Sequence, residues 1–113
     1  MTEKRVILEM GTGNDLHGGD YTKAAIRAVE DALHHSSLSL IRTLGIDKQS
    51  LRIDVTIGVQ RPERIDSAAV QAVLPFGRIT VKAVKGGLDV PDDEGGDVAV
   101  IATAGVEVWL DRP

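Results

Sequence analysis

Residues 6–20 read VILEMGTGNDLHGGD, and the rest of the chain is organised around this stretch. Its first five residues form an apolar run that is typical of a β-strand. The next nine contain four glycines, and Asp20 closes the stretch as a good N-cap for a helix. Loops that join rigid elements commonly carry function. The sequence therefore predicts a strand over Val6–Met10, a working loop over Gly11–Gly19 and a helix from Tyr21.

Composition limits the class of protein. A chain of 113 residues corresponds to a single domain, residues 1–113, and its 42% apolar but 3% aromatic content requires an aliphatic core. The net charge of −4 argues against nucleic acid as the main partner, and the absence of cysteine excludes disulfides and thiolate catalysis. No run is long and apolar enough for a signal peptide or a membrane span, so we expect a cytoplasmic protein without a membrane partner.

Helical periodicity continues from Tyr21 to about Leu44, and Gly45 is a natural residue to end the helix. Ser36-Ser37 is the place where this pattern could bend or break. A second, short helix is indicated before Pro75, with Asp66 or Ser67 as its N-cap.

Alternation of apolar and polar residues predicts the other strands. The clearest strand spans residues 51–60, a third spans 78–83, and Lys85-Gly86-Gly87 should bend or bulge the chain after it. Residues 97–103 and 106–110 indicate two final strands, with a turn at Ala104-Gly105.

This order of elements predicts an α/β (α+β) two-layer sandwich, in which a mixed sheet of about five strands carries one long and one short helix. Two helices of this size cannot cover both faces of such a sheet. The remaining apolar face predicts a partner, and the simplest partner is another copy of the chain. We therefore expect a homo-oligomer, either a trimer or a multiple of a dimer.

Once nucleotide binding is set aside, the glycine-rich loop allows three interpretations: a metal site, a structural turn and a catalytic site. Nucleotide binding is disfavoured, because Leu16 stands where the dinucleotide fingerprint requires glycine and the loop carboxylates would repel phosphate. A divalent metal could be bound by Asp15 and His17, since imidazole and carboxylate suit zinc, manganese or iron. Alternatively, Asp15 accepts backbone N–H bonds inside a tight turn and has a purely structural role.

A catalytic role is the third possibility. His17 beside Asp15 or Asp20 could act as an oriented general base, and Lys82 and Lys85 could point into a cleft. The simpler interpretation of Lys82 is the polar face of a strand. The residues that we expect to contact a small polar ligand are those of the loop: Gly11, Gly13, Asn14, Gly18 and Asp20.

The run from Gly11 to Gly18 matches the pattern G-x-G-x-D-x-H-G without a gap. This pattern resembles the signature of the Lin-type family of small conserved hypothetical proteins. The helix start at Thr22-Lys23-Ala24-Ala25 and the closing Gly105-Val106-Glu107-Val108 also resemble that family. The resemblance covers the whole chain, and it implies no established activity.

A second, fainter resemblance is to the ring-opening amidohydrolases of cyanuric acid and barbiturate. Gly13-Asn14 and Asp20-Tyr21-Thr22-Lys23 echo their strand–loop–helix stretch, although the spacing differs. Those enzymes use Ser–Lys pairs, and their serine-glycine-glycine stretch is absent here, with Lys85-Gly86-Gly87 standing nearest to it. Two hypotheses follow: a homo-oligomeric protein with a small-ligand or metal site at the loop, or a hydrolase of a small cyclic amide whose site is shared between subunits.

Overall fold

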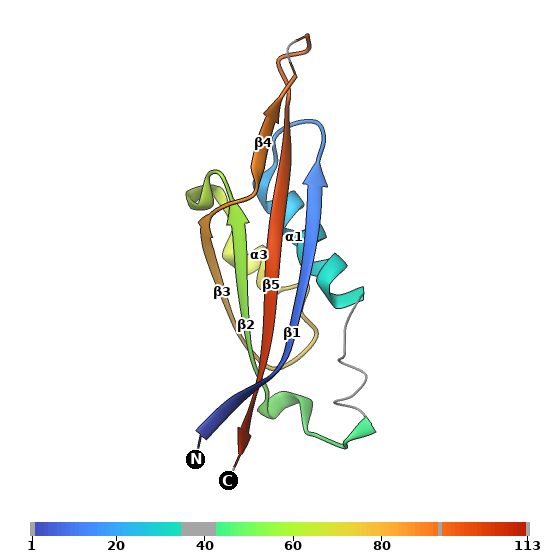
Figure 1. The fold of residues 1–113 in the computed structure, drawn as a ribbon, viewed down its shortest axis with the longest axis vertical. Helices are drawn as coiled ribbons and strands as arrows, with labels where there is room; N and C mark the ends of the chain where they lie inside the picture. Colours follow the sequence, from blue (N-terminus) through green and yellow to red (C-terminus); the bar gives the residue numbers. More distant parts are fainter. Residues whose placement is uncertain (1, 35–42, 93, 113) are drawn as a thin grey trace.

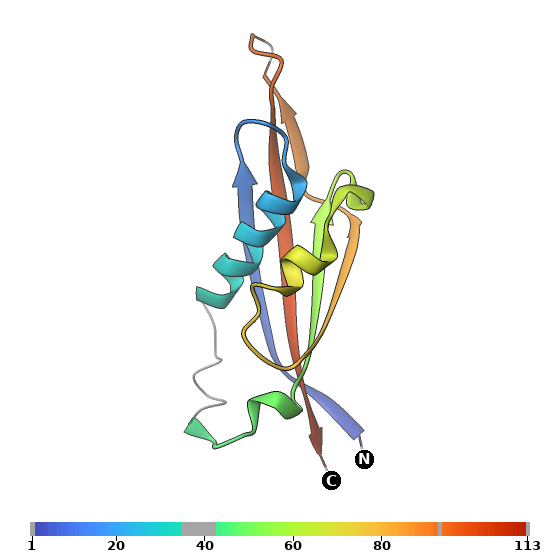
Figure 2. The same cartoon turned by 180° about the vertical axis from the view of Figure 1, so that it is seen from behind.

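A computed structural model describes residues 2–34, 43–92 and 94–112 of the chain. Five strands form one mixed sheet: β1 (Thr2–Asp15), β2 (Arg52–Val59), β3 (Arg78–Lys85), β4 (Leu88–Pro91) and β5 (Val98–Arg112). Two helices, α1 (Tyr21–His34) and α3 (Ser67–Gln71), lie together on one face of this sheet (Figures 1 and 2). The predicted α+β architecture, with a long and a short helix, is confirmed.

Strand β5 is the centre of the sheet. It pairs antiparallel with β1 along one edge and with β2 and then β4 along the other, while β2 pairs parallel with β3 (Figure 1). The predicted turn at Ala104-Gly105 is therefore wrong, because β5 runs without interruption through both residues. Hydrogen-bond ladders on both sides hold this segment extended, and a glycine inside a paired strand does not by itself impose a turn.

The core lies between the sheet and the two helices. Alternate residues of β2 and β5 point into it and are buried, among them Ile53, Ile57, Val100 and Val108. From α1 the core receives small side chains, because Ala24, Ala25, Ala28 and Ala32 are fully buried. An aliphatic core of Val, Ile, Leu and Ala agrees with the composition.

Helices α1 and α3 begin where their sequence signals predicted. The Asp20 carboxylate accepts the Lys23 backbone N–H at 3.0 Å, and the Asp66 carboxylate accepts the Ala69 N–H at 3.3 Å. Both aspartates therefore act as N-caps. The proposed interruption at Ser36-Ser37 lies outside the described residues.

Strand β1 is longer than predicted, and it contains the first half of the predicted loop. Gly11 and Gly13 are extended strand residues that pair with Ala104 and Ala102 of β5. A β-carbon at Gly13 would lie 2.2 Å from the Ala28 nitrogen, and one at Gly11 would lie 2.4 Å from the Ala28 oxygen. These glycines let the backbone of α1 lie directly on β1, which no other residue would permit.

Helix α1 also protects the free edge of β1. The Thr12 backbone N–H, which has no described strand on that side, donates to the Asp31 carboxylate of α1 at 2.9 Å. An unpaired strand edge can otherwise pair with other chains. The helix thus covers one face of β1 and occupies part of its edge.

We predict that Gly13→Ala destabilises the fold strongly, because the new methyl group would collide with helix backbone that cannot move aside. The free energy of unfolding should fall by about 3 kcal/mol or more, at the upper end of overpacking effects. Urea denaturation followed by circular dichroism measures it. Gly105→Ala is the matched control, since a β-carbon there meets nothing within 4 Å. Equal stability of the two variants would contradict the packing argument.

Candidate functional site

Asp15 is the last residue of β1, and its carboxylate is buried on the helix side of the sheet, with 5% of the side chain exposed. The Asp20 backbone N–H donates to Asp15 Oδ2 at 2.8 Å. Lys23 Nζ and Arg27 Nη1 lie 3.9 and 3.8 Å from Asp15 Oδ1. The hydrogen bond expected from the structural interpretation is present, because Asp15 accepts a backbone N–H bond and closes the turn that leads into α1.

The turn itself is short, because the strand ends only at Asp15 and the helix begins at Tyr21. Gly18 and Gly19 have positive φ angles of 94° and 61°, a conformation that glycine adopts at little cost. Asn14 precedes Asp15, and its carbonyl oxygen accepts Arg27 Nη1 at 2.6 Å. The predicted ligand role of these loop residues stays a prediction, although the positive φ angles of Gly18 and Gly19 give these two glycines a structural reason to be present.

His17 lies at the tip of the turn with 85% of its side chain exposed, and its Nδ1 atom is 3.6 Å from Asp97 Oδ2. Asp15, by contrast, is buried beneath α1. In the described part of the chain, no three histidine or acidic side chains gather as metal ligands would. The divalent metal at Asp15 and His17 therefore stays a prediction.

Lys82 and Lys85 belong to β3, which is separated from β1 by β5 and β2. Lys82 pairs in register with Thr56, so it shares the sheet face that carries no helix, while Asp15 faces the helices. The four residues proposed for catalysis are therefore distributed over the end of β1, the tip of the turn and strand β3. The structure does not bring them together within one chain.

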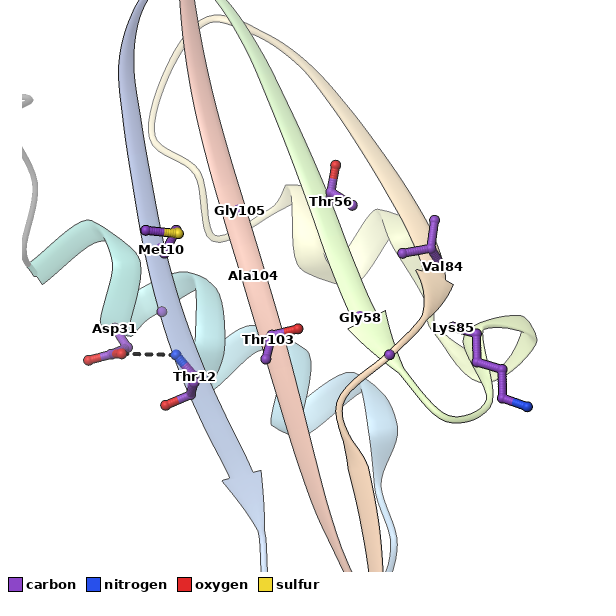
Figure 3. Close-up of a pocket in the computed structure, with 12 residues that line it drawn as sticks. Met10, Thr12, Asp31, Thr56, Gly58, Val84, Lys85, Thr103, Ala104 and Gly105 are labelled. Atoms are coloured by element: carbon purple, nitrogen blue, oxygen red, sulfur yellow. Dashed lines mark hydrogen bonds between the residues drawn. The ribbon is translucent and has the colours of Figure 1, made fainter.

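The sheet face opposite the helices, called the open face below, contains a hollow that the sequence reasoning missed. Its volume is about 590 Å³. Four strands and the bend after β3 line it, with Asp31 at its margin (Figure 3). The lining residues used below are Met10, Thr12, Thr56, Gly58, Val84, Lys85, Thr103 and Gly105.

Three threonines, Thr12, Thr56 and Thr103, supply the hydroxyl groups of the hollow (Figure 3). None of the three hydroxyls has a hydrogen-bond partner among the residues that the structure describes. They come from β1, β2 and β5, so only strand pairing brings them together. Free donors and acceptors in a concave surface are the usual means of orienting a small ligand.

Glycines shape one side of the hollow. The chain bends after β3, as predicted for Lys85-Gly86-Gly87, and passes over the end of β2 to pair with β5 as β4 (Figure 1). A β-carbon at Gly58 would lie 2.7 Å from Thr103 Oγ1, and one at Gly86 would lie 3.2 Å from the Gly58 α-carbon. Larger residues at these positions would push the bend outward.

On the helix side of the sheet, a hydrogen bond joins α1 to β4. The Tyr21 hydroxyl donates to the Asp89 carboxylate, and the Tyr21 ring is 5% exposed. Burial raises the pKa of Tyr21 above its ordinary value, and the neighbouring Asp89 raises it further. The phenol therefore stays protonated and able to donate. The sequence signal was an aspartate between the apolar residues Leu88 and Val90.

The fold and these features define a small two-layer α+β protein with one covered and one open sheet face. The chain belongs to the family described as "Conserved hypothetical protein (Lin0512_fam)", whose model matches residues 5–108. A solved structure from Nostoc punctiforme is similar to it, with 37% identity, a TM-score of 0.86 and 99% of each chain covered. That structure is described as an FtsZ-like protein of unknown function. No curated protein matches the chain.

We predict that Asp15→Ala lowers the free energy of unfolding by about 1–3 kcal/mol, because it removes the acceptor of a buried N–H group. Asp15→Asn keeps an oxygen in that place and should lose less. Chemical denaturation of the two variants and the wild type measures the difference. An Asp15→Ala variant as stable as the wild type would show that the carboxylate does not hold the turn.

Proposed function

We propose that this protein associates with copies of itself through the open face and binds a small polar ligand in the hollow on that face. The observation that carries the proposal is the one-sided cover of the sheet (Figures 1 and 2). Helices α1 and α3 pack on one face, and no described helix lies over the other. The proposal keeps a trimer or a multiple of a dimer as the expected assembly.

Large apolar side chains on the open face support the association. Leu8 and Met10 of β1 are 45% and 69% exposed, and Leu88 and Val90 of β4 are 58% and 47% exposed. Their register partners in β5 place all four on the face that carries Thr103 and Gly105. Burying one such side chain contributes roughly 1.5–3 kcal/mol, so burial of this face against a partner surface would stabilise the complex.

The charged end of the open face is already neutralised within the chain. Arg52 stacks over the Trp109 ring at 4.5 Å and lies 3.3 Å from Asp54, while Arg5 lies 3.2 Å from Glu107. Charges that are paired before association bring a smaller desolvation cost to an interface than isolated ones. This end can therefore border a contact between copies, with Trp109 on the open face beneath Arg52.

The proposed site differs in position from the loop that the sequence singled out. Gly11 and Thr12 belong to both, but the hollow lies on the other side of β1 from Asp15. A second copy placed against the open face would close the hollow, because the sheet bounds the hollow on one side only.

No described helix is long and apolar enough to cross a membrane.

We expect light scattering at micromolar concentration to give a mass two or more times that of the 12.1 kDa chain. The double variant Met10→Lys and Leu88→Lys should shift the protein to monomer, since it adds two charges to the apolar part of the open face. Leu16→Lys is the matched control, because Leu16 is 61% exposed but lies in the turn. A wild-type monomer would refute the association.

A hydrolase of a small cyclic amide is the second candidate function. It is favoured by Lys82, which is the register partner of Thr56 on the open face, beside the hollow. A hydroxyl beside an amine is a recurrent arrangement for a nucleophile and its base. In an assembly, lysines and threonines of neighbouring copies would share one site.

This second candidate is tested with cyanuric acid and barbituric acid as substrates, following ring opening by the loss of ultraviolet absorbance. Lys82→Met should abolish turnover while leaving the assembly intact. Lys4→Met is the control, because Lys4 is an exposed strand residue in β1 remote from Thr56 in the register. Turnover that persists in Lys82→Met would contradict the assigned role of this lysine.

A further inference from the structure

Gly105 is the one glycine whose presence the described part of the chain does not explain. Each of the other eleven has a positive φ angle or a heavy atom within 3.2 Å of the place that a β-carbon would occupy. At Gly105 the φ angle is not positive, and among the described residues other than its two chain neighbours no heavy atom lies within 4 Å of that place. Glycine inside a strand weakens the strand, and it often marks a site where a ligand or another backbone approaches closely.

The position of Gly105 shows where that approach takes place. It lies in the middle of β5, between Met10 of β1 and Thr56 of β2, and it forms part of the floor of the hollow (Figure 3). With no side chain at this point, the floor is bare peptide backbone. Peptide groups are planar, so a flat molecule can lie directly on them.

The walls of the hollow indicate the chemistry of that molecule. Met10 and Val84 supply apolar contacts from the two sides (Figure 3). The hydroxyls of Thr56 and Thr103 lie between them, and that of Thr12 lies on the same strand as Met10. Neither charged residue of the lining is placed to form an ion pair with a ligand in the hollow. Asp31 accepts the Thr12 backbone N–H, and the Lys85 side chain points away from Thr103 (Figure 3).

We propose that the hollow over Gly105 binds a small, planar, uncharged heterocycle with amide-type groups along its edge. The ring lies on the backbone of β5, and the threonine hydroxyls donate to and accept from its edge. A volume of about 590 Å³ is within the range of small-molecule sites. This inference rests on the proposed function, and it names the ligand class of the same site.

The test is isothermal titration calorimetry of the wild-type assembly with uracil, cytosine and hydantoin as uncharged planar probes. Cyclohexanol is the non-planar probe, and sodium acetate and sodium phosphate are the anionic probes. We expect at least one planar probe to bind and the other three compounds not to bind. Failure of all three planar probes, or preferential binding of the anions or of cyclohexanol, would overturn the proposed ligand class.

The decisive variant is Gly105→Val, which raises the floor of the hollow. Because nothing lies within 4 Å of the added β-carbon, the melting temperature should stay the same or rise. Affinity for the planar probe should fall at least tenfold. Thr80→Val, a neighbouring substitution on the same face in β3 outside the lining, should leave it unchanged. Unchanged probe affinity in Gly105→Val would overturn the proposal.

Light scattering of the same samples separates this inference from the proposed function. A wild-type monomer that binds uracil through Gly105 would refute the association and leave the ligand site standing. An assembly that binds no planar probe but dissociates in Gly105→Val would mean that the glycine accommodates a second copy of the chain. That result would overturn the ligand proposal and support the association.

Discussion

The direct contact between the backbones of β1 and α1 is the constraint on which the rest of the structure depends. Gly11 and Gly13 of β1 have no β-carbon, and the alanines of α1 that face them are fully buried. Gly13 lies against Ala24 and Ala28, and Gly11 lies against Ala28 and Ala32. Such an approach leaves no room for a β-carbon on the strand. It fixes the distance and the rotation of the helix at the same time, because interiors are packed too densely to tolerate a shift.

Several features of the molecule follow from this contact. With α1 so close, Asp31 reaches the edge of β1, and Lys23 and Arg27 come near the buried Asp15. The turn between strand and helix must then be short, and Asp15 closes it by accepting the Asp20 N–H. The charged residues near Gly11–Gly19 thus have structural roles. The loop sequence alone does not distinguish such roles from catalysis or ligand binding.

The same contact places the candidate site on the other face. Because the glycines and alternate core residues of β1 and β5 face the helices, Met10, Thr12, Thr103 and Gly105 face away from them. The open face therefore combines exposed apolar side chains, free hydroxyls and a glycine floor. The candidate residues that the sequence singled out are divided by the fold between the turn, the helix face of the sheet and strand β3. Membership in a family of conserved hypothetical proteins and the similar Nostoc structure are consistent with a fold that is shared within this family.

The sequence by itself determined the features that depend on neighbouring residues. Alternation identified β2, periodicity identified α1, and the caps at Asp20 and Asp66 marked where helices begin. It also indicated a sheet with one uncovered face, because the number and length of helices can be estimated from the chain alone. Only the tertiary structure decided that Gly13 packs on Ala28, that Thr103 lies over Gly58, and that Gly105 continues a long strand. Each of these depends on residues brought together by strand pairing and helix packing, so no local pattern in the sequence could encode it.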